Sequence, residues 1–138
     1  MELTLDDARR TLAAQPFSVL VGARVVTFGG GETTLEIDIR DELTQQNGFL
    51  HGGVLAYAAD NAITFAAGSV LGPLVLTGRV AIDYLRPAVG QVLSARATVT
   101  ESSARQAVAR CELATMDNGT RTVVATAQGT VVVVNRGA

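Results

Sequence analysis

The chain has 138 residues, a length that fits one domain, and we place that domain over residues 1–138. Hydrophobic residues make up 48% of the chain and charged residues 17%, which excludes an intrinsically disordered protein. The formal net charge of −2 and the sequence pI of about 5.3 offer no basic stripe for phosphates, so we expect no nucleic-acid partner. One cysteine and one histidine exclude an internal disulfide and metal sites built from Cys or His clusters.

The sequence favours a cytoplasmic protein without a membrane partner. The opening residues MELTLDDARR are acidic and polar, unlike a signal peptide. Three glycines and a proline interrupt the longest uncharged stretch, residues 61–78, whereas a membrane helix needs about 20 continuous apolar residues.

The N-terminal segment predicts one helix and two strands. Thr4 is a typical N-cap residue, and acidic residues follow it in the next turn. This pattern predicts a short amphipathic helix at about residues 4–14, ending near Pro16. Strand-like runs follow at 19–28 and 33–40. A run of three glycines joins them, and we interpret it as a hairpin turn.

The rest of the core predicts one helix followed by strands. Residues 54–67 are rich in alanine and apolar nearly all round, as in a helix buried on most sides. Beyond residue 74 the hydrophobic period is two, and the expected strands are 75–85, 91–102, 105–116 and 121–134. These elements predict an α+β fold in which one curled antiparallel sheet wraps around a long central helix, with a core over about 15–134.

Asp60 is the first candidate for chemistry. It is the only formally charged side chain between Glu42 and Arg79, and it lies in the middle of the alanine-rich helix. A buried, unpaired carboxylate is costly, so we expect either a function or a structural role in capping or in pairing with an arginine. Thr64, one helical turn further on, is placed to hydrogen-bond that carboxylate or a water that it holds.

The second candidate is the segment His51-Gly52-Gly53, at the start of the central helix. Backbone N–H groups at the positive end of a helix stabilise an oxyanion. The alternative is that these glycines only allow a tight turn. Gln45, Gln46 and Asn47 precede the segment and offer amides that can orient a carbonyl group or a water molecule.

Together, these residues resemble the hotdog-fold acyl-CoA thioesterases, in the branch related to the phenylacetate-degradation thioesterases. The resemblance covers roughly residues 15–134. It depends on the His-Gly-Gly segment with an acidic residue nine positions after the histidine. A second motif, a strand that ends in Arg-Pro, supports it. The matching residues are Gln45, Asn47, Gly48, Phe49, Leu50, His51, Gly52, Gly53, Val54, Leu55, Asp60, Thr77, Ile82, Asp83, Tyr84, Leu85, Arg86, Pro87 and Gly90.

The resemblance implies a role for each matching catalytic position. Asp60 corresponds to the acidic residue that acts as general base on water or as nucleophile, a point on which the family is divided. The Gly52 N–H corresponds to the oxyanion donor, and Gln45 to the residue that positions the thioester or the lytic water. His51 corresponds to a replaceable histidine that orders the loop, and Thr77 to a hydroxyl near the attacking water. No cofactor or metal is implied.

The resemblance also implies an oligomer and contacts with the substrate. Asp60 is expected to face Gln45 and Gly52 of the neighbouring subunit, so a homodimer is the minimum active unit, and such dimers commonly pair into homotetramers. Acyl-CoA is the expected substrate. Aromatic residues of this region can line an acyl pocket or belong to the core, and arginines can meet the CoA phosphates or remain surface charges. The residues that we assign to substrate binding are Asn47, Gly53, Thr64, Tyr57 and Arg86.

Two other functions remain open at this point. Hotdog domains also act as enoyl hydratases or dehydratases, but that chemistry pairs the helix acid with a histidine placed after it, and here the single histidine precedes Asp60. A non-catalytic acyl-CoA sensor usually carries a DNA-binding segment and lacks the acid. The acyl group, and the choice between CoA and acyl carrier protein, are not determined by the sequence.

Overall fold

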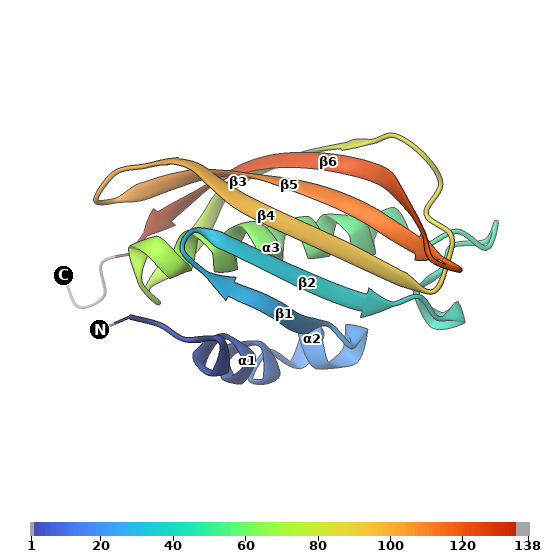
Figure 1. Cartoon of the computed structure of the whole chain (residues 1–138), viewed down its shortest axis with the longest axis horizontal. Coiled ribbons are helices and arrows are strands. Elements are labelled where there is room, and N and C mark those ends of the chain that lie inside the picture. Colours follow the sequence, from blue (N-terminus) through green and yellow to red (C-terminus); the bar gives the residue numbers. More distant parts are fainter. Residues whose placement is uncertain (1, 135–138) are drawn as a thin grey trace.

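The computed structural model describes residues 2–134, which form a six-stranded antiparallel sheet curled around one long helix (Figure 1). The strand order is β1-β2-β4-β5-β6-β3. The elements are α1 (Leu5–Ala13), α2 (Pro16–Val21), β1 (Arg24–Gly29), β2 (Glu32–Asp38), the 3-10 helix η1 (Asp41–Leu43), α3 (Gly52–Leu71), β3 (Val75–Tyr84), β4 (Val92–Ser102), β5 (Gln106–Asp117) and β6 (Thr120–Val133). The predicted fold, with its short N-terminal helix and central helix, is confirmed.

The N-terminal region contains one helix more than predicted. In α1, the Thr4 side chain accepts a hydrogen bond from the Asp7 N–H, and the Asp7 side chain accepts one from the Thr4 N–H, which forms a capping box. The strand predicted over 19–28 is wrong in its first part, because α2 extends to Val21. Pro16 at the start of α2 has a φ suited to a helix, and Gly22 ends the helix in the left-handed region (φ 83°). A short apolar run does not reveal its period, which explains the error.

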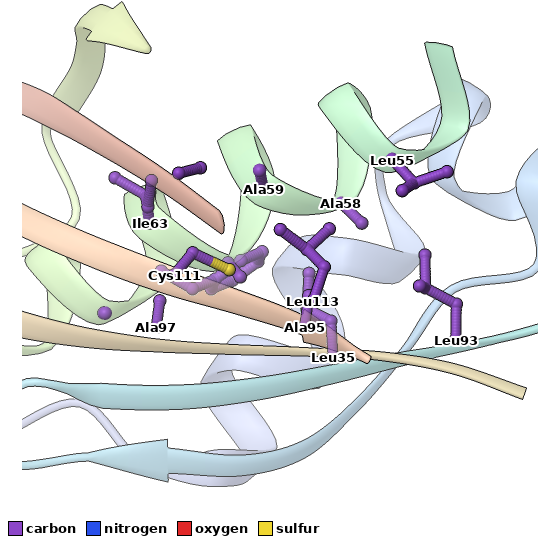
Figure 2. Close-up of a cluster of buried hydrophobic side chains, with 14 of the residues drawn as sticks. Leu35, Leu55, Ala58, Ala59, Ile63, Leu93, Ala95, Ala97, Cys111 and Leu113 are labelled. Atoms are coloured by element: carbon purple, nitrogen blue, oxygen red, sulfur yellow. The ribbon is translucent and has the colours of Figure 1, made fainter. Parts of the chain in front are cut away.

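The core lies between α3 and the concave face of the sheet. Figure 2 shows Leu55, Ala58, Ala59 and Ile63 of α3 facing side chains of the strands. Small alanines let strands approach the helix closely. At Gly129 of β6, an added Cβ would lie 2.6 Å from the Arg79 carbonyl oxygen and 3.4 Å from Ile63 Cδ1. The buried residues of α3 are Leu55, Ala58, Ala59, Ala62, Ile63, Phe65, Ala66, Ala67 and Gly68.

The apolar character of α3 follows from this burial. By length and mean hydropathy (1.3), the helix would suffice to cross a membrane. Here all six strands of the sheet pack against it, and an apolar helix of this kind is equally typical of a buried core.

The strands predicted beyond residue 74 and the hairpin turn predicted at the three glycines are confirmed. Residues 117–119 form the β5–β6 hairpin turn, in which Asn118 (φ 49°) and Gly119 (φ 85°) both adopt left-handed conformations. The three glycines at 29–31 connect β1 to β2, also with positive φ. Cys111 of β5 is buried, as expected of a small apolar residue.

An irregularity in β3 determines which of its side chains face the helix. β3 is an edge strand that pairs only with β6 within residues 2–134, and the register shifts between Thr77 and Arg79. Gly78 is the extra residue of this β-bulge. Side chains alternate between the two faces of a strand, so the bulge changes the phase and lets Thr77 and Val80 both point toward α3.

Candidate active site

A carboxylate and two hydroxyl groups meet between α3 and β3; we call Asp60, Thr64 and Thr77 the Asp60 cluster. The Thr77 hydroxyl donates a hydrogen bond to Asp60 Oδ1 at 2.6 Å. Thr64 Oγ1 lies 2.7 Å from Thr77 Oγ1, 2.8 Å from the Asp60 carbonyl oxygen and 3.3 Å from Asp60 Oδ1. The predicted neighbourhood of these three residues is thus present in a single chain.

The environment of Asp60 differs from the sequence-based expectation. The side chain is exposed in the single chain, because it lies on the side of α3 next to the β3 edge. None of the ion pairs among residues 2–134 involves Asp60, so the structural alternative of a paired arginine is wrong for the described chain. The Asp60 carboxylate is therefore oriented by a hydroxyl group and is open to solvent in the single chain.

The start of α3 supplies a free backbone donor. His51 is the N-cap, and its Nδ1 accepts the Gly53 N–H at 2.8 Å. The Gly53 N–H is therefore engaged within the loop. The Gly52 N–H, by contrast, has no acceptor among residues 2–134 and lies at the positive end of the helix. An N–H group in this position can donate a hydrogen bond to an oxyanion.

Tyr84, at the end of β3, contacts the same turn and was not singled out as a site residue by the sequence analysis. Its hydroxyl donates to the Gly52 carbonyl oxygen at 3.0 Å. A Cβ added at Gly52 would lie 3.4 Å from Tyr84 Cε1. The phenol therefore packs over the glycine and fixes the entry into α3.

The loop before α3 is held by its own hydrogen bonds. The Gln45 N–H donates to the Phe49 carbonyl at 2.8 Å, and the Gly48 N–H donates to the Gln45 carbonyl at 2.9 Å. The Gln45 side-chain oxygen accepts the Asn47 N–H, which leaves its amide NH₂ as a donor, and Asn47 itself is exposed. Gln45, Gly52 and Tyr84 line one open groove with a volume of about 350 Å³.

The groove and the Asp60 cluster are separate places on one chain. Gly52 and Asp60 are eight residues apart on a single helix, which corresponds to about 12 Å along its axis. One reacting carbonyl cannot touch both within a monomer.

Two residues assigned to substrate binding make structural contacts. The Tyr57 hydroxyl donates to Ser18 Oγ at 2.5 Å and accepts from Asn61 Nδ2 at 2.9 Å, in a network that joins α2 to α3. Arg86 Nη1 donates to the Val123 carbonyl at 2.7 Å, although the side chain remains exposed. The structure brings neither side chain into the Asp60 cluster.

A second cavity begins at the Asp60 cluster. It lies between α1 and α3, has a volume of about 190 Å³ and is lined in part by Thr64 and Phe65. The Phe65 ring meets the Phe28 ring edge-on, with the ring centroids 6.3 Å apart. No sequence pattern predicts this cavity, because the residues of α1, β1 and β3 that close it lie far apart along the chain.

Comparisons with known proteins agree on one family. The model of the thioesterase superfamily matches residues 47–122. A thioesterase family protein from Silicibacter pomeroyi is 31% identical, with a TM-score of 0.88 over 92% of this chain and 95% of that chain. No curated protein matches the chain.

Two further solved structures are phenylacetic acid degradation proteins. A variant of PaaI from Thermus thermophilus is 28% identical, with a TM-score of 0.76 over 87% of this chain and 100% of that chain. The PaaI protein of the phenylacetic acid degradation operon of E. coli is 20% identical, with a TM-score of 0.83 over 94% and 92% of the two chains. At that identity the likeness to the E. coli protein concerns the fold alone.

Proposed function

This chain belongs to the thioesterase superfamily and has its hotdog fold, and we propose that it hydrolyses acyl-CoA thioesters to a free acid and CoA. The family resemblance over roughly residues 15–134 is thereby confirmed at the level of family and fold. One observation carries the proposed reaction: an exposed carboxylate, Asp60, accepts a 2.6 Å hydrogen bond from Thr77 and has no cationic partner within residues 2–134.

The proposed chemistry needs one base and one oxyanion donor. Asp60 takes a proton from water as the water oxygen attacks the thioester carbonyl, or Asp60 itself attacks and forms a mixed anhydride that water then hydrolyses. The Gly52 N–H stabilises the negative charge that develops on the carbonyl oxygen. In the general-base route the carbon–sulfur bond breaks when the tetrahedral intermediate collapses, and the thiolate takes the proton that Asp60 removed from water. In the nucleophilic route this bond breaks as the anhydride forms, and the thiolate takes a proton from solvent before water releases the acid and restores the Asp60 carboxylate. Thr77 orients the carboxylate, and Gln45 orients the substrate.

We propose a homodimer as the smallest active unit, because Gly52 and Asp60 of one chain lie too far apart. β3 is an edge strand with exposed apolar residues at and near it, among them Leu74, Leu76, Tyr84 and Leu85. Such an edge favours pairing with a second copy of the strand.

The register of that pairing follows from two contacts. Tyr84 touches Gly52, and Thr77 touches Asp60. If two β3 strands pair antiparallel about a two-fold axis at Ala81, Val80 of one subunit lies opposite Ile82 of the other. Since Gly78 is the extra residue of the bulge, Thr77 of one subunit then lies opposite Tyr84 of the other. The oxyanion donor of one subunit then approaches the base of its partner. The further pairing of dimers into a homotetramer stays part of the proposal.

The test is thioester hydrolysis, followed by thiol release with a disulfide dye. The substrates are phenylacetyl-, hydroxybenzoyl- and straight-chain acyl-CoAs, each compared with the same acyl group on acyl carrier protein. We expect turnover of CoA esters by the wild-type protein, and light scattering should give the mass of a dimer or tetramer. Hydration of an enoyl-CoA without thiol release would favour a hydratase instead, and binding of CoA esters without any turnover would favour a sensor.

A further inference from the structure

The cavity between α1 and α3 is connected to the proposed base. Thr64 lines the cavity, and its hydroxyl is also part of the Asp60 cluster, 3.3 Å from Asp60 Oδ1. An acyl group whose carbonyl lies at Asp60 can therefore extend past Thr64 along α3. On that path Phe28 and Phe65 form an apolar wall, and Gly68 and Val75 lie further in.

Gly68 is an unusual residue on this path, because neither a positive φ nor crowding by neighbouring atoms requires glycine at this position. It lies inside α3, where glycine is less favourable than alanine, and it does not have a positive φ. A Cβ at this position would meet only Val75 Cγ2 within 4 Å, at the ordinary contact distance of 3.9 Å. Gly68 is one turn beyond Thr64, and the Cβ bonds of a helix tilt toward its N-terminus, so a side chain at 68 would project into the cavity beside Thr64.

The size and charge of the cavity limit what it can hold. Its volume of about 190 Å³ exceeds the roughly 150 Å³ of an engineered apolar cavity that binds benzene. One aromatic ring or a short alkyl chain fits such a space, whereas a long acyl chain does not. Among the lining residues that the structure describes, Asp7 alone is charged. Its carboxylate is hydrogen-bonded to Thr4 and ion-paired with Arg10 at the α1 side. Because none of the described lining residues is a cation, an acyl group that ends in a carboxylate would be desolvated there without a partner.

We propose that the cavity between α1 and α3 holds the acyl group and that Gly68 determines its permitted size. The preferred substrates are then neutral acyl groups of up to about one aromatic ring or a short chain. The inference rests on the proposed thioesterase function and deepens it, because it assigns the acyl site and a specificity-determining residue.

The experiment compares wild type, Gly68→Ala and Gly68→Leu, with Val70→Leu as the control for added bulk on the exposed side of α3. Hydrolysis of acetyl-, butyryl-, hexanoyl- and phenylacetyl-CoA is measured for each. We expect Gly68→Leu to lower kcat/KM for hexanoyl- and phenylacetyl-CoA by about tenfold or more, with little change for acetyl-CoA. Gly68→Ala should show a smaller loss on the same two substrates and a raised Tm, because alanine is the better helix former.

The outcomes separate the two proposals. If the wild-type protein hydrolyses CoA esters and the Gly68 variants keep its order of substrates, the inference about Gly68 is overturned while the proposed function stands. If the wild-type protein hydrolyses none of them, the proposed function fails. In that case, binding of phenylacetate to the cavity is tested by the rise in Tm that phenylacetate produces. A rise that is lost in Gly68→Leu and kept in Val70→Leu supports the acyl site, and an equal rise in all variants refutes it. Should Gly68→Leu fail to fold, Gly68→Ala decides the question.

Discussion

The hydrogen bond from Thr77 to Asp60 is the contact most specific to the proposed mechanism, and Thr77→Val removes it with little change in shape. Valine keeps the β-branched form of threonine and suits a strand. The variant should therefore fold and assemble like the wild type. It should lose activity, because the carboxylate is no longer held in place and Thr64 Oγ1, at 3.3 Å from Asp60 Oδ1, is a weaker substitute.

The expected loss follows from the geometry. Hydrogen bonds to charged groups contribute about 1.5–3 kcal/mol, and each 1.36 kcal/mol corresponds to about a tenfold change in rate. Because Asp60 is exposed in the single chain, the lower end applies, and kcat/KM should fall about tenfold. Thr64→Val should cost less, about threefold, since its contact with the carboxylate is longer. The double variant should lose less than the product of the two, because both hydroxyls serve one carboxylate and lie 2.7 Å apart.

The assay is the thiol-release rate at subsaturating acyl-CoA, with unfolding in urea measured in parallel. Thr126→Val is the matched control, because Thr126 is exposed on β6 and does not belong to the Asp60 cluster. Wild-type kcat/KM in Thr77→Val, or strictly multiplicative losses in the double variant, would refute the role given to this hydroxyl.

Three further predictions concern the fold and the neighbouring turn. Gly129→Ala should lower the free energy of unfolding by about 1–3 kcal/mol in a urea titration, since the new Cβ would lie 2.6 Å from the Arg79 carbonyl oxygen; unchanged stability would contradict the close packing of β6. Burial raises the pKa of the Cys111 thiol from 9.0 to about 12. The native protein should therefore react slowly with the disulfide dye and expose one thiol per chain only in denaturant, and fast labelling of the native protein would be inconsistent with this. Because the unfolded thiol loses its proton at lower pH than the folded one, this residue's contribution to stability is complete below pH 9 and declines as the pH rises toward 12. Tyr84→Phe should leave the urea midpoint nearly unchanged and lower kcat/KM a few-fold, because the Gly52 turn loses a 3.0 Å hydrogen bond; a variant as active as wild type would argue against a positioning role for the phenol.

Sequence patterns predicted the sheet and the central helix because alternation in strands and alanine-rich apolar runs are local properties. The helix α2 was not predicted, because a short apolar segment such as 16–21 fits the period of a helix or of a strand. Its helical form depends on burying Ser18 and Val21. The bulge at Gly78 has no readable signal, because the apolar residues Leu76, Val80 and Ile82 keep one even-numbered alternation across it. Leu76 is nevertheless exposed, since the bulge changes which face of the sheet the side chains occupy.

The site was predictable only where a motif marks it. Asp60 was proposed because its charge is isolated in an apolar helix, and the roles of Gly52 and Gln45 were proposed from the family resemblance. The exposure of Asp60 depends on β3 being an edge strand, which is a property of the whole sheet. The network of Tyr57, Ser18 and Asn61 depends on how α2 packs onto α3, and no spacing within either helix reveals it.

The most direct test of the central claim is the rate of acyl-CoA hydrolysis by Asp60→Asn, measured beside the wild type and Asp83→Asn. Asp83 is an exposed carboxylate on β3 that does not belong to the Asp60 cluster, so it controls for the loss of one surface charge. Asparagine keeps the shape of the side chain and removes its basicity and its nucleophilic oxygen. Asp60→Asn should therefore fold and assemble normally while kcat falls by about 100-fold or more, and Asp83→Asn should keep wild-type turnover. Undiminished hydrolysis in Asp60→Asn would contradict the assignment of this residue as base or nucleophile.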